Sequence, residues 1–302
     1  MTSINSTAIV PKPKSVSLHG DFWTRFLLWL MRWLPESWML FLVRPISVVF
    51  FLAAKQQRAG IICNLRALHP EMGPLGLWCA SHAVFVQFAL TYMDRLWHMH
   101  FQRDIEWEFE NDDALKSVLR KPGGILLFTL HSGNYDIAAT LIYDVFKRPL
   151  HIVRKRERSE SLQKIRSREL ELSRGLHVHY NDDPWALGVE LCELLQAGEV
   201  VAVLADRPVA GLSTSTFDHE GLKVLLPQGP LVLAQVARVP CFPIFLTRLG
   251  VCRYRATFGS AIYDGARRES ADQIGHAWLS VMMDFLRCHF DQWFVFENVI
   301  AR

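Results

Sequence analysis

The pattern of apolar and polar positions changes near residue 100, and this change divides the chain into two regions. Over residues 21–100, apolar residues recur three and four positions apart, a spacing typical of amphipathic helices. Beyond residue 101, short apolar runs alternate with helical stretches, which predicts an α/β fold with a mostly parallel central sheet flanked by helices. We therefore expect an N-terminal helical region over residues 21–100 and an α/β domain over residues 101–302. Residues 1–20 are polar, lack the features of a signal peptide and are expected to form a flexible tail.

Strands are predicted where short apolar runs are bounded by glycine, proline or charged residues, at residues 124–130, 149–153, 177–180, 199–205, 241–246 and 254–260. Residues 104–110 alternate charged and apolar side chains, which predicts an edge strand with an acidic outer face. Residues 211–226 contain a run of Ser and Thr and are expected to form a mobile polar loop. A helix is expected to begin after Pro227, with the backbone amides near Gly229 available to an oxyanion or a phosphate.

The N-terminal helices are unusually rich in large aromatic residues. The chain contains ten tryptophans, and its mean hydropathy is positive, which points to a membrane surface or a lipidic ligand. Residues 38–54 are nearly all apolar but include Arg44, and a central arginine costs about 2.5–3.5 kcal/mol on insertion scales. A transmembrane position for residues 38–54 is therefore disfavoured, and we expect the first two helices to lie in one leaflet of the membrane. The alternative is that these helices only cover the core.

Charge and cysteine content exclude several classes of function. A net charge of +3 over 302 residues is too small to produce an electrostatic field that would favour binding of nucleic acid. The six cysteines form no CxxC pair, which is typical of reduced thiols, and His177 and His179 have no ligand partner at metal-site spacing, so no metal is expected. The chain contains no GxSxG, GxxxxGK[ST] or GxGxxG motif, which argues against hydrolases, P-loop proteins and dinucleotide-binding proteins.

Candidate chemistry lies where the strand over residues 124–130 ends. His131, Asn134 and Asp136 follow this strand directly, and ligands of open α/β sheets bind beyond the carboxyl ends of the strands. If the next helix starts within this cluster, Asp136 lies in its first turn and reaches one nitrogen of the imidazole. The other nitrogen would then accept a proton from a nucleophile. The alternative is a structural histidine.

Basic residues and a second charged pair are expected near the same edge. Asp206 and Arg207 follow the strand over residues 199–205, where they either join the site or bridge only each other. A basic segment that follows the strand over residues 149–153 includes Arg154, Arg168 and Arg174. It would suit an anionic headgroup, a phosphopantetheine or an acidic carrier protein, unless it is only a solvated helix face.

These motifs resemble a known family. The cluster from His131 to Asp136 is similar to the H-x4-D signature of glycerolipid acyltransferases. The chain over residues 21–296 resembles their bacterial branch of lipid A biosynthesis lauroyl and myristoyl acyltransferases and phosphatidylinositol mannoside acyltransferases. Three further stretches carry this resemblance, namely an R-x5-NLR-x3-P element at residues 58–70, the pair Asp206-Arg207, and a Pro-x-Gly-Pro element at residues 227–230 with its continuation to residue 243. The chain departs from the family at residues 219–221 and in residues 292–297, which lack a basic stretch, so the acceptor is the least defined part.

The resemblance implies an acyltransferase of the H-x4-D type, with His131 as general base and Asp136 as its orienting acid. The donor would be acyl carrier protein or acyl-CoA, and the acceptor a hydroxyl of a membrane lipid or glycolipid, without a cofactor or metal. Asn134, Arg154, Arg168, Arg174, Asp206, Arg207 and Gly229 are the candidate substrate-binding residues. The expected location is the cytoplasmic face of the inner membrane, peripheral or monotopic. Two alternatives remain, namely acyl transfer to a polyketide, aryl polyene or aminolipid acceptor, and a lipid-binding protein without catalysis.

Overall fold

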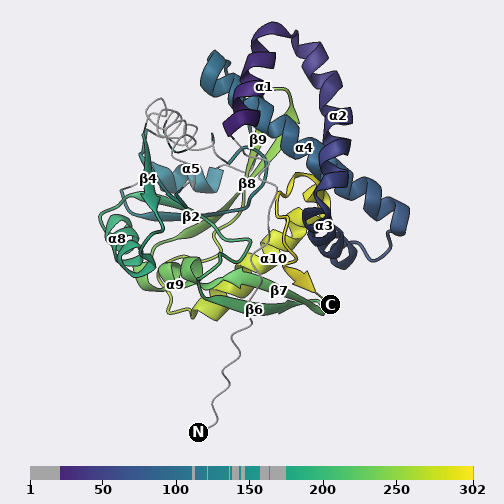
Figure 1. The fold of residues 1–302 in the computed structure, drawn as a ribbon. Coiled ribbons are helices and arrows are strands. Elements are labelled where there is room, and N and C mark those ends of the chain that lie inside the picture. The colour runs from purple at the N-terminus through teal and green to yellow at the C-terminus, as the bar shows by residue number, and fades with distance from the viewer. Residues whose placement is uncertain are drawn as a thin grey trace.

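The computed structural model describes residues 21–110, 113–120, 122–135, 137, 143, 147–156, 163 and 175–301. Its N-terminal region is helical, as the spacing of apolar residues predicts. The helices are α1 (Asp21–Trp33), α2 (Glu36–Ala53), α3 (Lys55–Leu68) and α4 (Pro74–Phe101). Pro35 is the N-cap residue of α2 and separates it from α1. Figure 1 shows α1 and α2 as a hairpin beside the α/β layers, with α4 passing between the hairpin and the sheet.

The central sheet is mostly parallel, as predicted. Its order is β1-β9-β8-β2-β5-β3-β4, and all neighbouring pairs except β8 and β9 are parallel. The bounds are β1 (Glu106–Glu110), β2 (Ile125–Thr129), β3 (Leu150–Arg154), β4 (Leu176–Tyr180), β5 (Val200–Leu204), β8 (Cys241–Gly250) and β9 (Arg253–Phe258). β1 lies at one edge with its acidic side chains partly exposed, which confirms the predicted edge strand.

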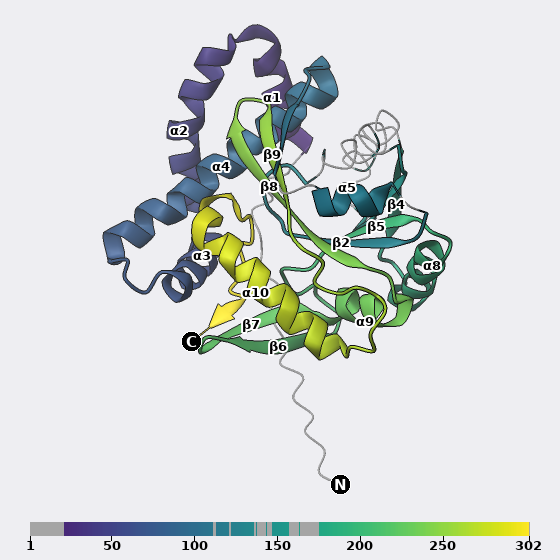
Figure 2. The ribbon, with the colours of Figure 1, turned by 180° about the vertical axis from the view of Figure 1, so that it is seen from behind.

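Helices cover both faces of this sheet (Figure 2). Alternate residues of β2 point to opposite faces, as they do in any strand. Leu126 and Phe128 pack in a core with α8 (Pro184–Gln196), α9 (Gln228–Ala237) and α10 (Ala271–His289). Ile125 and Leu127 pack in a second core with α5 (Asp113–Leu119). β2 therefore has both faces buried, which explains its continuous apolar run.

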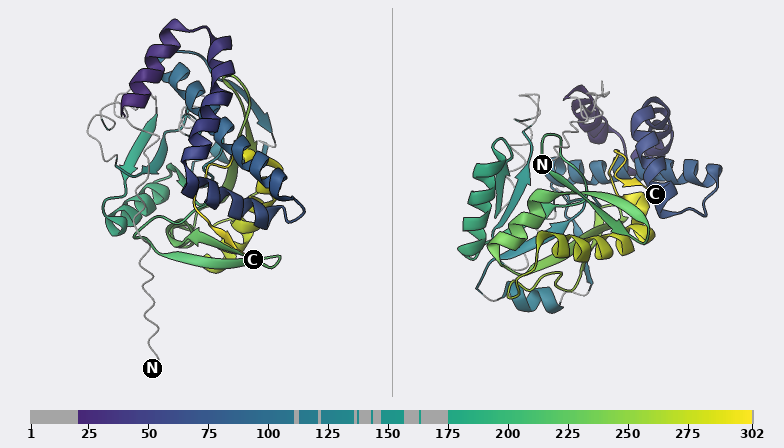
Figure 3. Two further views of the ribbon diagram at one scale, coloured as in Figure 1. Left: turned by 45° about the vertical axis from the view of Figure 1, so that its right-hand side comes forward. Right: turned by 90° about the horizontal axis from the view of Figure 1, so that it is seen from below.

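A small second sheet replaces the loop predicted over residues 211–226, so that prediction is wrong. β6 (Thr214–His219) and β7 (Leu222–Pro227) form an antiparallel hairpin, and β10 (Ile300–Ala301) pairs with β7. Glu220 and Gly221 make the turn with positive φ angles of 52° and 77°. Phe217 and Val224 point inward from the hairpin and are buried. This sheet packs beside α10, as the lower part of Figure 3 shows.

The end of the chain joins the helical region to the α/β layers. After α10, the chain passes through the short helix η1 (Phe290–Gln292) and crosses the carboxyl end of β2, where Trp293 forms an antiparallel bridge with Ser132. Phe294 and Phe296 then pack with Phe51 and Phe85 from α2 and α4. The two regions therefore share one of the hydrophobic cores, and the domain boundary near residue 100 stays a prediction.

Candidate active site

His131 lies at the carboxyl end of β2, where the chain leaves the sheet. The turn that follows is tight, since Gly133 has a φ of +51° and a Cβ atom there would lie 2.5 Å from the carbonyl oxygen of Leu246. Only glycine allows this close approach to β8. The imidazole is held at the sheet edge with 14% of its side chain exposed.

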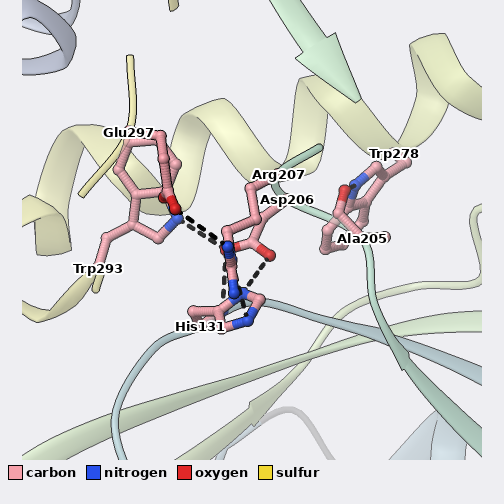
Figure 4. A network of polar contacts seen from close by, with 7 residues as sticks. All are labelled: His131, Ala205, Asp206, Arg207, Trp278, Trp293 and Glu297. Atoms are coloured by element: carbon pink, nitrogen blue, oxygen red, sulfur yellow. Dashed lines mark hydrogen bonds and ion pairs between the residues drawn. The ribbon is translucent and has the colours of Figure 1, made fainter. Parts of the chain in front are cut away.

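Asp206 lies beside His131 because of the register between two neighbouring parallel strands. Thr129 of β2 pairs with Leu204 of β5, so the residues two positions further along each strand emerge side by side. Nδ1 of His131 lies 2.7 Å from Oδ1 of Asp206, and the backbone N–H of His131 donates to Oδ2 at 2.8 Å. Figure 4 shows the carboxylate against the imidazole. The alternative that Asp206 and Arg207 only bridge each other is therefore wrong.

The Asp206 carboxylate is fully buried and is held by further donors. The indole Nε1–H of Trp293 donates to Oδ2 at 2.9 Å, and the indole of Trp278 fixes the preceding residue by donating to the carbonyl of Ala205 at 2.9 Å (Figure 4). Burial by itself raises the pKa of the Asp206 carboxyl. The charge of His131 and the hydrogen bonds from His131 and Trp293 outweigh this and lower the pKa below its ordinary value. Asp206 is therefore a carboxylate, and it faces the imidazole and not solvent.

These contacts define the tautomer of His131. A carboxylate only accepts hydrogen bonds, so Nδ1 carries the hydrogen that is donated to Asp206. At the other nitrogen, Nε–H of Arg207 donates to Nε2 at 3.2 Å. Nε2 is therefore the nitrogen with the lone pair, which is the arrangement that a general base requires.

Arg207 connects the imidazole to the end of the chain. Its Nη1 lies 3.2 Å from Oε1 of Glu297, whose side chain is 62% exposed. The same end segment also holds the backbone of the site, since the N–H of Phe294 donates to the carbonyl of His131 at 2.7 Å. Trp293, Phe294 and Glu297 thus contribute to the site, although none of them is among the site residues that the sequence predicts.

Asn134 belongs to a buried polar network behind the turn. Its side-chain N–H donates to the carbonyl of Thr91 in α4 at 3.2 Å and lies 3.4 Å from the hydroxyl of Tyr254. That hydroxyl donates to Asp94 at 2.7 Å, and Asp94 also accepts from Arg248 at 2.7 Å. Burial raises the pKa of Asp94, although the hydrogen bonds and charge of Arg248 oppose it. The network ties α4 to β8 and β9, and the role of Asn134 in substrate binding stays a prediction.

The other predicted site residues are not brought into contact with His131 within the part of the chain that the structure describes. Arg154 ends β3, which is separated from β2 by β5. Gly229 is exposed in the first turn of α9, and a Cβ atom added to it would meet nothing within 4 Å. Asp136, Arg168 and Arg174 lie outside the described residues, so their assignments stay predictions.

His177 and His179 lie on β4, the edge strand of the sheet, which β3 separates from β5. His179 contacts Nδ1 of His151 at 2.9 Å through Nε2 and Oε1 of Glu190 at 2.9 Å through Nδ1, so its two nitrogens are both used. Among the described residues, no group of three or more His, Cys, Asp or Glu side chains is arranged to hold a metal ion.

The fold and this site define an α/β protein with a carboxylate-held histidine at the carboxyl edge of a mostly parallel sheet. Residues 11–300 match the family model described as bacterial lipid A biosynthesis acyltransferase. The match extends over nearly the whole chain, and the protein belongs to this acyltransferase family. No curated protein matches the chain in sequence.

Among solved structures, the chain is similar to a crystal structure of the 1-acyl-sn-glycerophosphate acyltransferase PlsC from Thermotoga maritima. The two share 11% sequence identity with a TM-score of 0.39, over 84% of this chain and 99% of that chain. This likeness is too distant to carry an argument about the site.

Proposed function

We propose that this protein transfers a fatty acyl group from a thioester donor to a hydroxyl of a lipid or glycolipid acceptor, with His131 as the general base. One observation carries the proposal: a buried carboxylate holds Nδ1–H of the imidazole, which leaves the lone pair on Nε2 at the sheet edge where substrates of α/β proteins bind. Membership of the acyltransferase family supports acyl transfer over other uses of a base.

In this mechanism Nε2 of His131 removes the proton of the acceptor hydroxyl while its oxygen attacks the thioester carbonyl carbon. The carbonyl becomes a tetrahedral oxyanion, which then expels the donor thiolate. The imidazolium returns its proton to the leaving sulfur, and an ester remains on the acceptor. Asp206 favours the imidazolium because its carboxylate contacts Nδ1–H without intervening solvent.

The burial of Ser132, Cys241 and Cys252 supports direct transfer without an acyl-enzyme. Ser132 follows the base directly, but its side chain is fully buried. Burial raises the pKa of Cys241, and it raises the pKa of Cys252 to about 12, so both remain thiols at neutral pH. None of these side chains is placed to attack a thioester from solvent.

Asp206 is the orienting acid in this proposal, although the sequence alone pointed to Asp136. Nδ1 carries a single hydrogen, and that hydrogen is donated to Asp206. The assignment of Asp136 to this role stays a prediction. Arg154, Arg168, Arg174 and Arg207 remain our candidates for the phosphates of acyl carrier protein or acyl-CoA, and Gly229 for backbone contact with an anion.

The N-terminal helices supply the proposed membrane contact. Large apolar side chains project from α1 and α2 into solvent, namely Phe26, Trp29, Trp33, Trp38, Phe41, Ile46, Val48, Val49 and Leu52. In the described part of the chain, α2 and α4 are long and apolar enough to cross a membrane. The contacts of Asp94 and Thr91 tie α4 to the sheet, which supports helices that lie in one leaflet and do not span the membrane. The cytoplasmic face of the inner membrane is proposed from the resemblance to the family alone.

The experiment that tests this function uses the full-length protein with a radiolabelled acyl thioester and bacterial lipid extract. We expect label in a phospholipid or glycolipid, detected after chromatographic separation. Label found only on a polyketide, aryl polyene or aminolipid acceptor would support the specialised-metabolite alternative. Lipid binding without any transfer of label would contradict the enzymatic proposal and leave the lipid-binding alternative.

A further inference from the structure

In the structure, the lone pair of the proposed base already accepts a hydrogen bond. Nε2 of His131 offers one lone pair, and it accepts the Nε–H of Arg207 at 3.2 Å. A hydroxyl that is to lose its proton must approach the same lone pair along the same direction. Arg207 therefore has to move away before His131 acts as a base.

Glu297 holds Arg207 in this position from the opposite side. Oε1 of Glu297 lies 3.2 Å from Nη1 of Arg207, so the guanidinium bridges the imidazole and the carboxylate (Figure 4). About a third of the Arg207 side chain is exposed, and more than half of the Glu297 side chain is. The bridge therefore lies at the solvent side of the site, where an arriving anion can compete with Glu297 for the guanidinium.

The backbone that carries Glu297 is fixed, so the carboxylate is presented from a defined point. Nδ2 of Asn64 in α3 donates to the carbonyl of Glu297 at 2.8 Å, and its Oδ1 accepts from the backbone N–H groups of Val299 and Ile300 at 2.9 and 3.1 Å. Gly60 lets the two backbones approach, since a Cβ atom there would lie 2.2 Å from the carbonyl oxygen of Phe296.

We propose that Glu297 is a positioning residue that keeps Arg207 over the base in the free enzyme, and that a phosphate group on the substrate draws Arg207 away and so exposes Nε2. This inference rests on the proposed function, because it assigns a regulation to the same base. The phosphate belongs either to the pantetheine arm of the donor or to the acceptor lipid. In both cases the base is uncovered only when an anionic substrate is in place.

The first test is Glu297→Gln, measured as KM and kcat for acyl transfer by the full-length protein. Loss of an exposed ion pair changes an equilibrium by about two- to fivefold, so we expect KM for the phosphate-bearing substrate to fall by that factor with kcat unchanged. Glu297→Asp should restore part of the wild-type KM. An unchanged or higher KM in Glu297→Gln would overturn the inference.

The chain offers a matched control in Glu220 of the β6–β7 turn, which pairs with Arg287 of α10. The exposed fractions of these two side chains are 63% and 37%, against 62% and 34% for Glu297 and Arg207. Glu220→Gln removes an equally exposed ion pair that does not include Arg207 and should leave KM unchanged. An equal fall in KM in this control would also overturn the inference, because the effect would then come from surface charge in general.

Arg207→Gln identifies which substrate carries the phosphate. We expect kcat/KM to fall for the phosphate-bearing partner and to rise for its phosphate-free counterpart, because the base is then uncovered without help. The donor arm compares acyl-CoA with the N-acetylcysteamine thioester, and the acceptor arm compares a phosphorylated lipid with its dephosphorylated form. The arm with this reversal identifies the source, and no reversal in either arm contradicts the inference. The two proposals fail in different ways. If His131→Ala still transfers acyl groups, the proposed function itself is wrong. If only Glu297→Gln gives a negative result, the inference about Arg207 is wrong and the proposed function stands.

Discussion

The imidazole of His131 has both ring nitrogens engaged by charged neighbours. Asp206 accepts from Nδ1 at 2.7 Å, and Arg207 donates to Nε2 at 3.2 Å. Asp206 fixes the hydrogen on Nδ1, and Arg207 occupies the lone pair of Nε2. In the proposed mechanism, Nε2 loses its contact with Arg207 before it accepts the proton of the acceptor hydroxyl.

Asp206→Asn should lower kcat for acyl transfer by about 10²- to 10⁴-fold, because an amide can donate to Nδ1 and hold the ring in the wrong tautomer. The measurement is steady-state transfer with circular dichroism as a check of folding. Trp293→Phe is the control, since it removes one donor to Asp206 and leaves the carboxylate in contact with the ring. A smaller loss is expected there, and a loss equal to that in Asp206→Asn would argue against a tautomer effect.

The lowered pKa of Asp206 makes a second prediction, for stability against pH. A carboxyl whose folded pKa lies below its ordinary value of about 3.9 stabilises the fold above that value, and this contribution is lost as pH falls through the folded pKa. Asp206→Asn should therefore be less stable than wild type near pH 6, and the difference should shrink below about pH 4. Urea unfolding midpoints over this range provide the measurement. A difference that stays constant with pH would show that Asp206 titrates as an ordinary surface carboxyl does.

Local sequence pattern was enough to find His131 and Asp206 but not their contact. Each follows a short apolar strand, and both strands were predicted from sequence. The sequence does not show that β2 and β5 are neighbours, and only this adjacency, with Thr129 opposite Leu204, brings the two residues together. Trp293 and Glu297 were missed for the same reason, since residues far apart in the sequence meet only in the folded chain.

At the scale of elements, the β6–β7 hairpin was missed although its sequence carries a signal. Serine and threonine at residues 213–216 favour a polar loop by composition, whereas the alternation of apolar and polar residues continues through Phe217 and resumes at Leu222 and Val224. Threonine favours strands as well as loops, and a Glu-Gly pair at positive φ is compatible with a tight hairpin turn. One face of the hairpin is then buried against α10, and β10 pairs with the free edge of β7.

The contact between α3 and the end of the chain makes an element-scale prediction. Gly60→Ala should lower the free energy of unfolding by about 1–3 kcal/mol, because the new Cβ meets the carbonyl oxygen of Phe296. It should also lower activity, since this segment carries Trp293 and Glu297.

Gly76→Ala in α4 is the control. Its nearest neighbour is Cβ of Met72 at 3.8 Å, so a neutral or stabilising effect of up to about 1 kcal/mol is expected. Similar destabilisation of both variants would contradict the close packing at Gly60.

At the scale of the whole molecule, exposed apolar side chains gather on the α1–α2 hairpin, which lies apart from α8 in Figures 1 and 2. The first two helices also bury residues such as Phe51 and Met39 in the cores they share with α4. Removal of both helices would therefore expose these cores as well as remove a membrane contact. Substitution of exposed side chains separates the two effects.

The double substitution Trp33→Ser and Phe41→Ser should reduce binding to anionic liposomes by at least tenfold, because each side chain is 69% exposed and large enough to contribute more than 1 kcal/mol when transferred from water. Sedimentation with vesicles measures this. Trp185→Ser removes an 87% exposed tryptophan from α8 and should leave binding unchanged. Equal loss in both variants, or none in either, would contradict membrane contact through α1 and α2.

The most direct test of the account compares acyl transfer by wild type and His131→Ala, both full length, with the same labelled thioester and lipid acceptor. Loss of a general base should reduce turnover by at least 10²-fold. Because the substitution also leaves the buried Asp206 without its imidazole partner, circular dichroism checks that the variant is folded under the assay conditions. Turnover by a folded His131→Ala protein at the wild-type rate would contradict the claim that Nε2 of this imidazole takes the acceptor proton.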